Sequence, residues 1–111
     1  MNITVTGIGY VGLVTGVCLA EMGHKVICMD INEEKIDMLK RGRSPIYEPG
    51  IEPLLERNLA KGKLRFTSCH KAAYGNAEII FIAVGTPQLE DGTANLEYIM
   101  KVAETIPQYL R

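Results

Sequence analysis

Apolar positions along the chain alternate between short runs typical of strands and longer stretches with helical spacing. The first run, residues 2–6, is rich in β-branched side chains and leads into an apolar stretch of helical length at residues 11–22. Gly23 follows that stretch as a candidate left-handed residue at the end of the helix. A second apolar run at residues 25–30 predicts another strand. The first part of the chain is therefore predicted to fold as strand, helix and strand.

The remainder of the chain continues this alternation. Asn32 is a good N-cap, with two glutamates in the first turn, for a helix that runs to about Arg41. The elements predicted after it are a helix at residues 51–60, a strand at 64–67, a helical turn capped by Ser68 and stopped at Gly75, a strand at 78–84, and a helix from Asn95 that Pro107 ends.

Strands that alternate with helices predict a parallel sheet with right-handed crossovers. We expect an α/β fold of Rossmann type, with about four strands in the order 3-2-1-4 and helices on both faces. In that order the carboxyl ends of the first and fourth strands flank a crevice, with residues 7–12 and 84–87 on opposite lips. The complete fold has six strands, and an apolar strand is unfavourable at a bare sheet edge. Residues 1–111 are therefore expected to be an incomplete domain of a larger protein.

The glycines after the first strand indicate the chemistry. The motif Gly7-x-Gly9-x-x-Gly12 follows the strand directly, and Asp30 ends the second strand. Gly7 would turn the chain, Gly9 would leave room for a pyrophosphate at the helix N-terminus, and Gly12 would let the helix approach the sheet. Strand, glycine turn, helix, strand and terminal acid together predict a dinucleotide site, the alternative being a purely structural glycine turn.

Composition argues against several classes of function. Charged residues make up 23% of the chain and the net charge is −1, so no basic field for nucleic acid or an anionic membrane is expected. The basic clusters at residues 40–43 and 57–65 have acids nearby and are expected to be solvated faces. Residues 1–20 carry no charge, but glycines interrupt them and no cleavage pattern follows. A buried strand and helix are favoured over a signal peptide or membrane span.

The cysteines and histidines do not have the spacing of a metal site. Cys18, Cys28 and Cys69 lack any CxxC or Cys–His pattern, so no metal is expected. Cys18 and Cys28 are interpreted as buried small hydrophobic residues in a reducing compartment. His24 follows a helix end and His70 opens a helical turn, and both are interpreted as structural or exposed.

Four segments form a combination that is more specific than a glycine motif alone. They are Gly7-Ile8-Gly9-Tyr10-Val11-Gly12-Leu13, Asp30 with Lys35, Pro45-Ile46-Tyr47-Glu48-Pro49-Gly50-Ile51, and Val84-Gly85-Thr86-Pro87 with Asp91-Gly92. Over essentially its whole length, the chain resembles the N-terminal NAD-binding domain of the UDP-glucose/GDP-mannose dehydrogenase family. The segment Pro45-Ile46-Tyr47-Glu48-Pro49-Gly50 is the most specific part, because general dinucleotide folds do not share it.

The resemblance implies an NAD-dependent oxidoreductase whose parent protein converts UDP-glucose to UDP-glucuronate with two NAD. GDP-mannose or a UDP-N-acetylhexosamine is an alternative substrate, and a free-standing NAD-sensing regulatory module is an alternative function. The family's catalytic cysteine segment is not present, so no catalytic residue is assigned and no turnover by this chain alone is expected. The resemblance further implies a cytoplasmic, homo-oligomeric parent that binds a nucleotide sugar and neither nucleic acid nor membrane.

The resemblance also implies which residues contact the cofactor. Asp30 would accept hydrogen bonds from the adenosine ribose, and Lys35 would lie beside that ribose, although Lys35 is otherwise interpreted as an exposed helix lysine. The loop at residues 45–50, stiffened by two prolines, would border the active site or simply connect two helices. The pyrophosphate loop would consist of Gly7, Ile8, Gly9, Tyr10, Val11 and Gly12, and the second lip of Val84, Gly85, Thr86 and Pro87.

Overall fold

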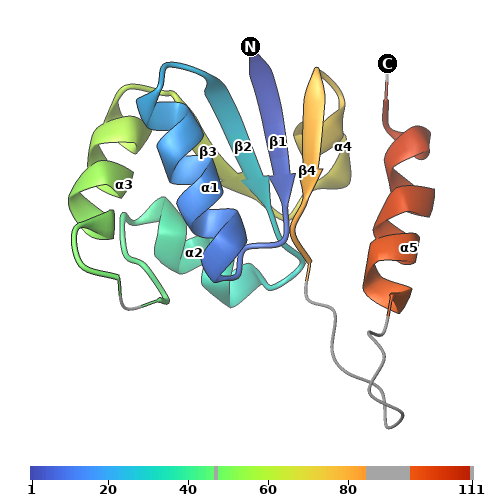
Figure 1. The fold of residues 1–111 in the computed structure, drawn as a ribbon, viewed down its shortest axis with the longest axis horizontal. Coiled ribbons are helices and arrows are strands. Elements are labelled where there is room, and N and C mark those ends of the chain that lie inside the picture. Colours follow the sequence, from blue (N-terminus) through green and yellow to red (C-terminus); the bar gives the residue numbers. More distant parts are fainter. Residues whose placement is uncertain (47, 85–95, 111) are drawn as a thin grey trace, which may run out of the picture.

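The computed structural model describes residues 1–46, 48–84 and 96–110. Figure 1 shows a central sheet with helices on both sides. Its elements are β1 (Asn2–Thr6), α1 (Tyr10–Glu21), β2 (Lys25–Met29), α2 (Glu33–Lys40), α3 (Ile51–Ala60), β3 (Leu64–Thr67), α4 (His70–Tyr74), β4 (Ile79–Ile82), α5 (Glu97–Thr105) and the 3-10 turn η1 (Ile106–Gln108).

The four strands form one parallel sheet in the order β3-β2-β1-β4. Val5 of β1 lies opposite Cys28 of β2 on one side and opposite Phe81 of β4 on the other. The predicted fold class and strand order are therefore confirmed. The chain reverses its direction of travel across the sheet between β3 and β4, so the carboxyl ends of β1 and β4 lie side by side, where ligands of such folds bind.

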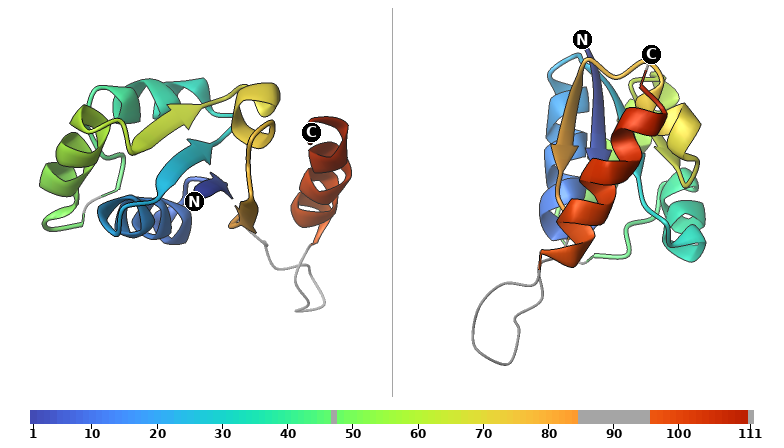
Figure 2. Two further views of the ribbon diagram at one scale, coloured as in Figure 1. Left: turned by 90° about the horizontal axis from the view of Figure 1, so that it is seen from above. Right: turned by 90° about the vertical axis from the view of Figure 1, so that its right-hand side faces the viewer.

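One face of the sheet is covered by α1, α2 and α3. Alternate residues of β1, β2 and β3 point to this face and form a core with leucine, isoleucine and valine side chains of the three helices. In the views of both Figure 1 and Figure 2, α1 and α3 lie on the side of the sheet opposite α5. This burial of strands by crossover helices is the usual arrangement of a parallel sheet.

Helix α1 approaches the sheet most closely at Gly16. A Cβ atom at Gly16 would collide with the Sγ atom of Cys28 on β2. Gly12 permits a close approach as well, as predicted, because a Cβ atom there would collide with the carbonyl of Gly7 after β1 and would touch the Cβ atom of Ala83 after β4. The prediction that Cys18 is buried is wrong, because α1 turns Gly16 and Val17 toward the sheet and leaves Cys18 exposed.

The opposite face is covered by α4, α5 and η1, and its buried part is more polar. The Thr4 hydroxyl donates to the carbonyl of Ala73, and the hydroxyls of Thr6 and Tyr74 hydrogen-bond at 2.8 Å. Tyr74, Met29 and Ile106 form a second, smaller apolar cluster here. This face is therefore held to α4 by hydrogen bonds as well as by apolar packing.

Most predicted element boundaries agree with the structure to within two residues. The strand predicted at residues 78–84 is shorter, Ile79–Ile82, although the Glu78 and Ala83 amides still donate to β1 carbonyls. Ser68 was predicted to cap α4, but the N-cap is Cys69, whose amide donates to the Thr67 hydroxyl. Helix α5 gives way to the 3-10 turn that contains Pro107, as predicted, whereas Asn95 lies outside the described residues.

Strand β4 lies at the edge of the sheet formed by the described residues. The side chains of Ile79, Phe81 and Ile82 are each about 40% exposed there, although apolar edge strands are usually covered or paired. Within the described ranges, no helix is long and apolar enough to span a bilayer.

Candidate functional site

The turn after β1 leads the chain into the crevice. Gly7 has a φ of +97°, which side chains rarely adopt, and its amide donates to the Met29 carbonyl at 2.8 Å. A Cβ atom at Gly7 would also lie only 2.8 Å from the carbonyl of Ala83 and the amide nitrogen of Val84. Only glycine fits at this position, where the carboxyl ends of β1, β2 and β4 converge.

The N-terminus of α1 lies at this turn without a capping side chain. Gly9 is the N-cap residue, forms no side-chain cap, and would have no heavy atom within 4 Å of an added Cβ atom. No acidic residue occupies the first helical turn, in which Tyr10 and Val11 are 53% and 67% exposed. The first amides of a helix lack partners within the helix and carry a partial positive charge. The open space at Gly9 therefore suits an anionic group such as a pyrophosphate.

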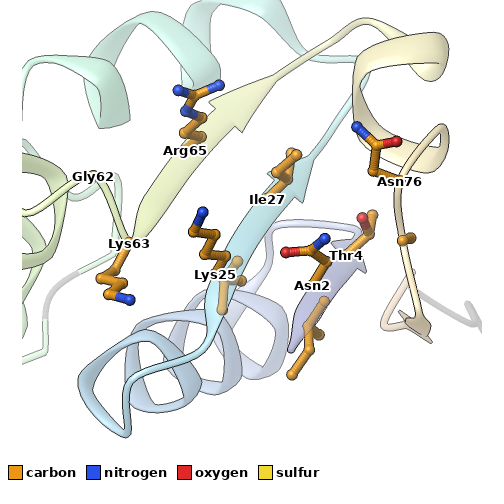
Figure 3. Close-up of a pocket in the computed structure, with 11 residues that line it drawn as sticks. Asn2, Thr4, Lys25, Ile27, Gly62, Lys63, Arg65 and Asn76 are labelled. Atoms are coloured by element: carbon orange, nitrogen blue, oxygen red, sulfur yellow. The ribbon is translucent and has the colours of Figure 1, made fainter.

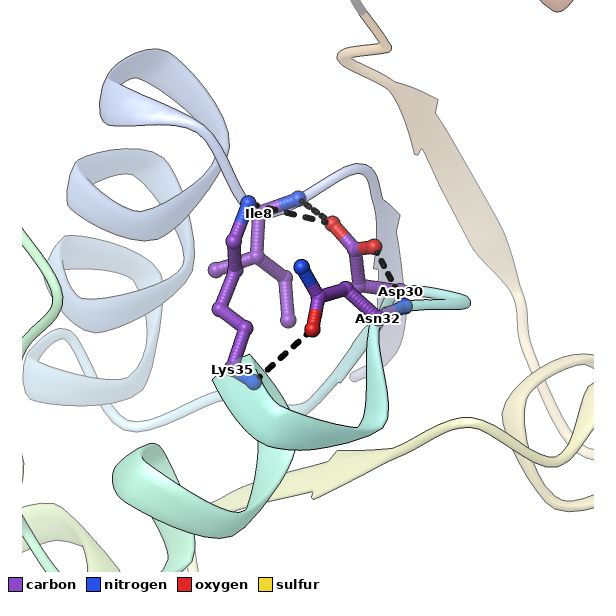
Figure 4. A network of polar contacts seen from close by, with 4 residues as sticks. All are labelled: Ile8, Asp30, Asn32 and Lys35. Carbon is purple, nitrogen blue, oxygen red and sulfur yellow. Dashed lines mark hydrogen bonds and ion pairs between the residues drawn. The ribbon is translucent and has the colours of Figure 1, made fainter.

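Asp30 connects the glycine turn to the start of α2 (Figure 4). Its Oδ2 atom accepts a hydrogen bond of 2.9 Å from the Ile8 amide, and its Oδ1 atom accepts one of 3.0 Å from the Asn32 amide. The Lys35 ammonium lies 3.8 Å from Oδ2, and the Lys35 amide donates to the Asn32 side chain, which caps α2 as predicted. A carboxylate has about four lone-pair sites, so Asp30 retains capacity to accept bonds from a ligand.

A largely apolar cavity of about 360 Å³ lies beside Asp30 and Gly7. Helix α5 contributes Lys101, Val102 and Thr105 to its wall, and α4 contributes His70 and Tyr74. The cavity is lined by Thr6, Gly7, Met29, Asp30, Ile31, His70, Tyr74, Val84, Lys101, Val102 and Thr105. A volume of this size can hold a flat aromatic ring system next to the carboxylate of Asp30.

The family of the chain follows from its match to known proteins. Residues 1–111 match the model of the UDP-glucose/GDP-mannose dehydrogenase family, NAD binding domain. The chain belongs to this family. It is 54% identical over 111 residues to a UDP-glucose 6-dehydrogenase of Bacillus subtilis, a match that covers 100% of this chain and 25% of that relative. It is 43% identical to a GDP-mannose 6-dehydrogenase of Pseudomonas putida, again over 100% of this chain and 25% of the relative.

Solved structures of family members have the same fold. The crystal structure of a ternary complex of GDP-mannose dehydrogenase from Pseudomonas aeruginosa superposes with a TM-score of 0.92 at 42% identity, covering 96% of this chain and 24% of that chain. A UDP-D-ManNAc dehydrogenase from Pyrococcus horikoshii gives 0.93 at 32% identity, covering 98% and 26%. The chain thus spans about a quarter of the length of the UDP-glucose/GDP-mannose dehydrogenases that it matches.

Within this NAD-binding domain, the structure brings together most of the residues that the sequence singled out. Ile8, Asp30 and Lys35 form one polar network, and Gly7, Asp30 and Val84 line one cavity. Gly9, Tyr10, Val11 and Gly12 form the first turn of α1 and the residue before it. The remaining members of the second lip, Gly85, Thr86 and Pro87, lie outside the described residues.

The described residues of the family-specific loop at 45–50 include one that influences the first residue of α1. The Glu48 carboxylate lies near the Tyr10 hydroxyl and raises the pKa of Tyr10. The Ser44 hydroxyl donates to the Ile46 carbonyl at 2.7 Å and accepts from the Ile46 amide at 3.1 Å, which fixes the start of the loop. Tyr47 lies outside the described residues. This places Glu48 of the loop beside the first residue of α1.

Several cavity residues were not singled out from the sequence. Lys101, Val102 and Thr105 have no motif, and only the packing of α5 against the cluster of Met29 and Tyr74 brings them to Asp30. His70 was interpreted as structural or exposed; it is half-buried, its ring stacks on that of Tyr109 with centroids 5.4 Å apart, and it lines the cavity. Ile31 offered a signal in the sequence, because it is an apolar residue directly after the acid that ends the second strand. In the structure its side chain is 78% exposed beside the cavity.

The cysteines do not contribute to this cavity. Cys18 and Cys69 are exposed, and Cys28 is buried beneath Gly16 on the opposite face of the sheet. Burial raises the pKa of the Cys28 thiol to about 12, so this thiol is not a nucleophile near neutral pH. Among the described residues, no group of histidine, cysteine and acidic side chains could hold a metal ion.

Proposed function

We propose that the chain is the NAD-binding part of a nucleotide-sugar 6-dehydrogenase that converts UDP-glucose to UDP-glucuronate with two NAD. The observation that carries this proposal is the Asp30 network, which joins a carboxylate, the glycine turn and the uncapped helix N-terminus. Relatives named UDP-glucose 6-dehydrogenase at 54%, 48% and 50% identity support UDP-glucose as the substrate.

Each part of the crevice suits one part of the cofactor. The α1 N-terminus at Gly9 and Val11 would hold the pyrophosphate through its free amides. Asp30 would accept hydrogen bonds from the adenosine ribose, with Lys35 beside it. The apolar cavity between Ile31 and Val102 would take the adenine ring. When bound, NAD supplies a hydride acceptor.

The second lip and the loop at residues 45–50 would serve the opposite half of the cofactor. Val84 follows β4 into the crevice, and Gly85, Thr86 and Pro87 continue it in the sequence. The Thr86 hydroxyl or amide would donate to the cofactor there. Glu48, which lies near the Tyr10 hydroxyl, would border the nucleotide-sugar side of the site. The chain supplies binding and orientation in this scheme, and no residue of it acts as the nucleophile.

The parent protein is proposed to be a cytoplasmic homo-oligomer that takes a nucleotide sugar and binds neither nucleic acid nor membrane. GDP-mannose is the second candidate substrate, because GDP-mannose 6-dehydrogenases are 42–44% identical to this chain. A UDP-N-acetylhexosamine is a third, since a UDP-N-acetyl-mannosamine dehydrogenase shares the fold at 32% identity. A free-standing NAD-sensing module remains the alternative from a different class.

The proposal is tested by titrating the 111-residue chain with NAD⁺ while its amide NMR signals are recorded. Shifts at Ile8, Val11 and Asp30, with none on the exposed side of α3, are the expected result. Added UDP-glucose should yield no NADH, because the chain holds no suitably activated cysteine. Absence of NAD⁺ binding would overturn the proposal, and so would NADH formation that depends on Cys18, Cys28 or Cys69.

A further inference from the structure

A second pocket lies on the α4 face of the sheet, at the amino ends of the strands and away from the crevice (Figure 3). It has a volume of about 250 Å³. We call it the basic pocket. Its lining residues are Asn2, Ile3, Thr4, Lys25, Val26, Ile27, Gly62, Lys63, Arg65, Asn76 and Ala77.

The pocket exists because the crossover from β3 to β4 is short. Helix α4 has only five residues, and it contacts the sheet at Thr4 and Thr6 of β1 and at Met29 of β2. The amino ends of β2 and β3 are therefore left without a helix on this face (Figure 3). Parallel strands are usually covered on both faces, so an open stretch over a central strand such as β2 calls for an explanation.

Among the described residues, three cations and no acid line the basic pocket. Arg65 lies opposite Ile27 in the register of β2 and β3, and Lys63 directly precedes Leu64, which lies opposite Val26. Lys25 and Lys63 are thus neighbours across the two strands, an arrangement that costs free energy when both are charged. Within the described part of the chain, the two ion pairs are Lys35–Asp30 and Arg57–Glu21, so the three cations have no acidic partner there.

Two ordinary explanations do not account for this cluster. Basic residues often protect the edge strands of sheets against pairing, which can account for Arg65 on the edge strand β3 and for Lys63 before it, but not for Lys25, because β2 has strands on both sides. A generally basic protein would carry such clusters anywhere, but this chain has a net charge of −1. The sequence suggested that Lys63 and Arg65 belong to a charge-balanced face, whereas the fold groups them with Lys25 and, among the residues that line the pocket, with no acid.

We propose that the basic pocket binds a small phosphate-bearing anion. Guanidinium and ammonium groups are donors without acceptors, and they match the several oxygens of a phosphate. The side-chain amides of Asn2 and Asn76 border the same space, whereas the backbone amide of Asn2 donates to the Glu78 carboxylate at 3.0 Å. The volume of about 250 Å³ is sufficient for a phosphate or diphosphate group but not for a helix of a partner protein. This site is separate from the crevice, and the inference does not depend on the proposed function.

The test is a titration of the ¹⁵N-labelled 111-residue chain with inorganic pyrophosphate in the presence of excess NAD⁺. Amide shifts at Lys25, Lys63 and Arg65 that weaken with added salt are expected, because exposed charges are screened. Shifts confined to residues 7–12 would overturn the proposal, as would no shifts at all. The positions of the shifted amides also distinguish this proposal from the proposed NAD-binding function, since a failure to bind NAD⁺ would alter only the shifts around the glycine turn.

A pair of matched variants completes the test. The double substitution Lys25→Gln and Arg65→Gln should weaken pyrophosphate binding by at least about tenfold, through loss of two charge-assisted contacts. The control Lys40→Gln and Arg43→Gln removes the same charge from exposed positions at the end of α2 and should change the affinity by less than about twofold. An equal loss of pyrophosphate affinity in both variants would show an effect of net charge and would overturn the proposal that the basic pocket binds the anion. Wild-type shifts at Lys25 and Arg65 provide an independent measurement if the first variant is unstable.

Discussion

On one face of the sheet, helices α1, α2 and α3 bury apolar side chains from three strands, whereas on the other face α4 and α5 cover the strands only in part. The first face has Cys28 and Gly16 in direct contact. The second carries buried threonine and tyrosine hydroxyls, the cavity beside Asp30 and the basic pocket. The closed face is therefore fully packed, and the partly covered face carries the two cavities for which we propose ligands.

The difference between the faces has a topological cause. The crossovers on the first side pass through helices of eight to twelve residues, whereas the crossover from β3 to β4 uses the five residues of α4. A helix rises about 1.5 Å per residue, so α4 cannot follow the whole length of the strands. The length of one connection thus decides how much of the second face is available to ligands.

The largest expected effect is on stability, and it comes from a substitution that overfills the closed face. Gly16→Val should lower the free energy of unfolding by about 3 kcal/mol or more, because the new side chain meets the Cys28 sulfur in a fully packed layer. Chemical denaturation followed by circular dichroism measures this. Cys18→Val, on the exposed side of the same helix, should change the value by less than about 0.5 kcal/mol. Similar losses for the two variants would mean that α1 does not lie as close to β2 as described.

The next effect concerns the crevice on the partly covered side. A 2′-phosphate about 4 Å from the Asp30 carboxylate would be repelled by roughly 4 kcal/mol at an effective dielectric near 20, and Lys35 offsets part of this. We therefore expect NAD to bind at least about a hundredfold more tightly than NADP, or about 3 kcal/mol. Asp30→Ala should weaken NAD binding by roughly 30-fold or more, because charge-assisted hydrogen bonds are lost and the Ile8 amide loses its acceptor. The difference in affinity between NAD and NADP should become smaller.

Calorimetric titration of both cofactors measures this preference, with Asp37→Ala as a control that removes an exposed acid from α2. The control should retain the wild-type ratio of affinities. Equal affinities for NAD and NADP in the wild type would remove Asp30 from the ribose site. The same conclusion would follow if the ratio were unchanged in Asp30→Ala.

A smaller effect tests the polar floor of the cavity. Tyr74→Phe removes the 2.8 Å hydrogen bond to Thr6 and should lower the free energy of unfolding by about 1 to 2 kcal/mol, because the Thr6 hydroxyl is left buried. Tyr109→Phe keeps the ring that stacks on His70 and should cost less than about 0.5 kcal/mol. Urea denaturation of both variants gives the comparison. If Tyr74→Phe were as stable as Tyr109→Phe, the hydroxyl pair would not hold α4 to β1.

The smallest effect tests whether Glu48 of the loop at residues 45–50 lies near Tyr10 at the start of α1. Glu48→Gln should lower the pKa of Tyr10 toward its ordinary value of about 10, because the accepting carboxylate raises it. Because the pKa of Tyr10 is higher in the folded chain than in the unfolded chain, it stabilises the fold at every pH below the unfolded pKa. This stabilisation is lost as the pH rises through the pKa of Tyr10 in the folded chain. Tyrosine ¹³C shifts recorded against pH measure it, with Glu52→Gln as the control. An unchanged Tyr10 titration in Glu48→Gln would exclude the contact.

Local sequence patterns were sufficient for the elements and for the first half of the crevice. The glycine turn, the acid at the end of β2 and the Asn32 cap depend on residues within about thirty positions of one another, and each has a specific backbone requirement. These constraints act along the chain, so the motif alone predicts them. The sheet order followed for the same reason, because alternating strands and helices allow few right-handed arrangements.

Contacts between distant segments were decided only by the tertiary structure. The sequence did not show which face of α1 meets the sheet, so Cys18 was assigned to the core and Gly16 was not recognised as a second point of close approach besides Gly12. Nor does any spacing bring Lys101 to Asp30, or Lys25 to Lys63 and Arg65. Those groupings depend on helix rotation, on the docking of α5 and on the short α4, which are set by packing across the sheet rather than by neighbours in the chain.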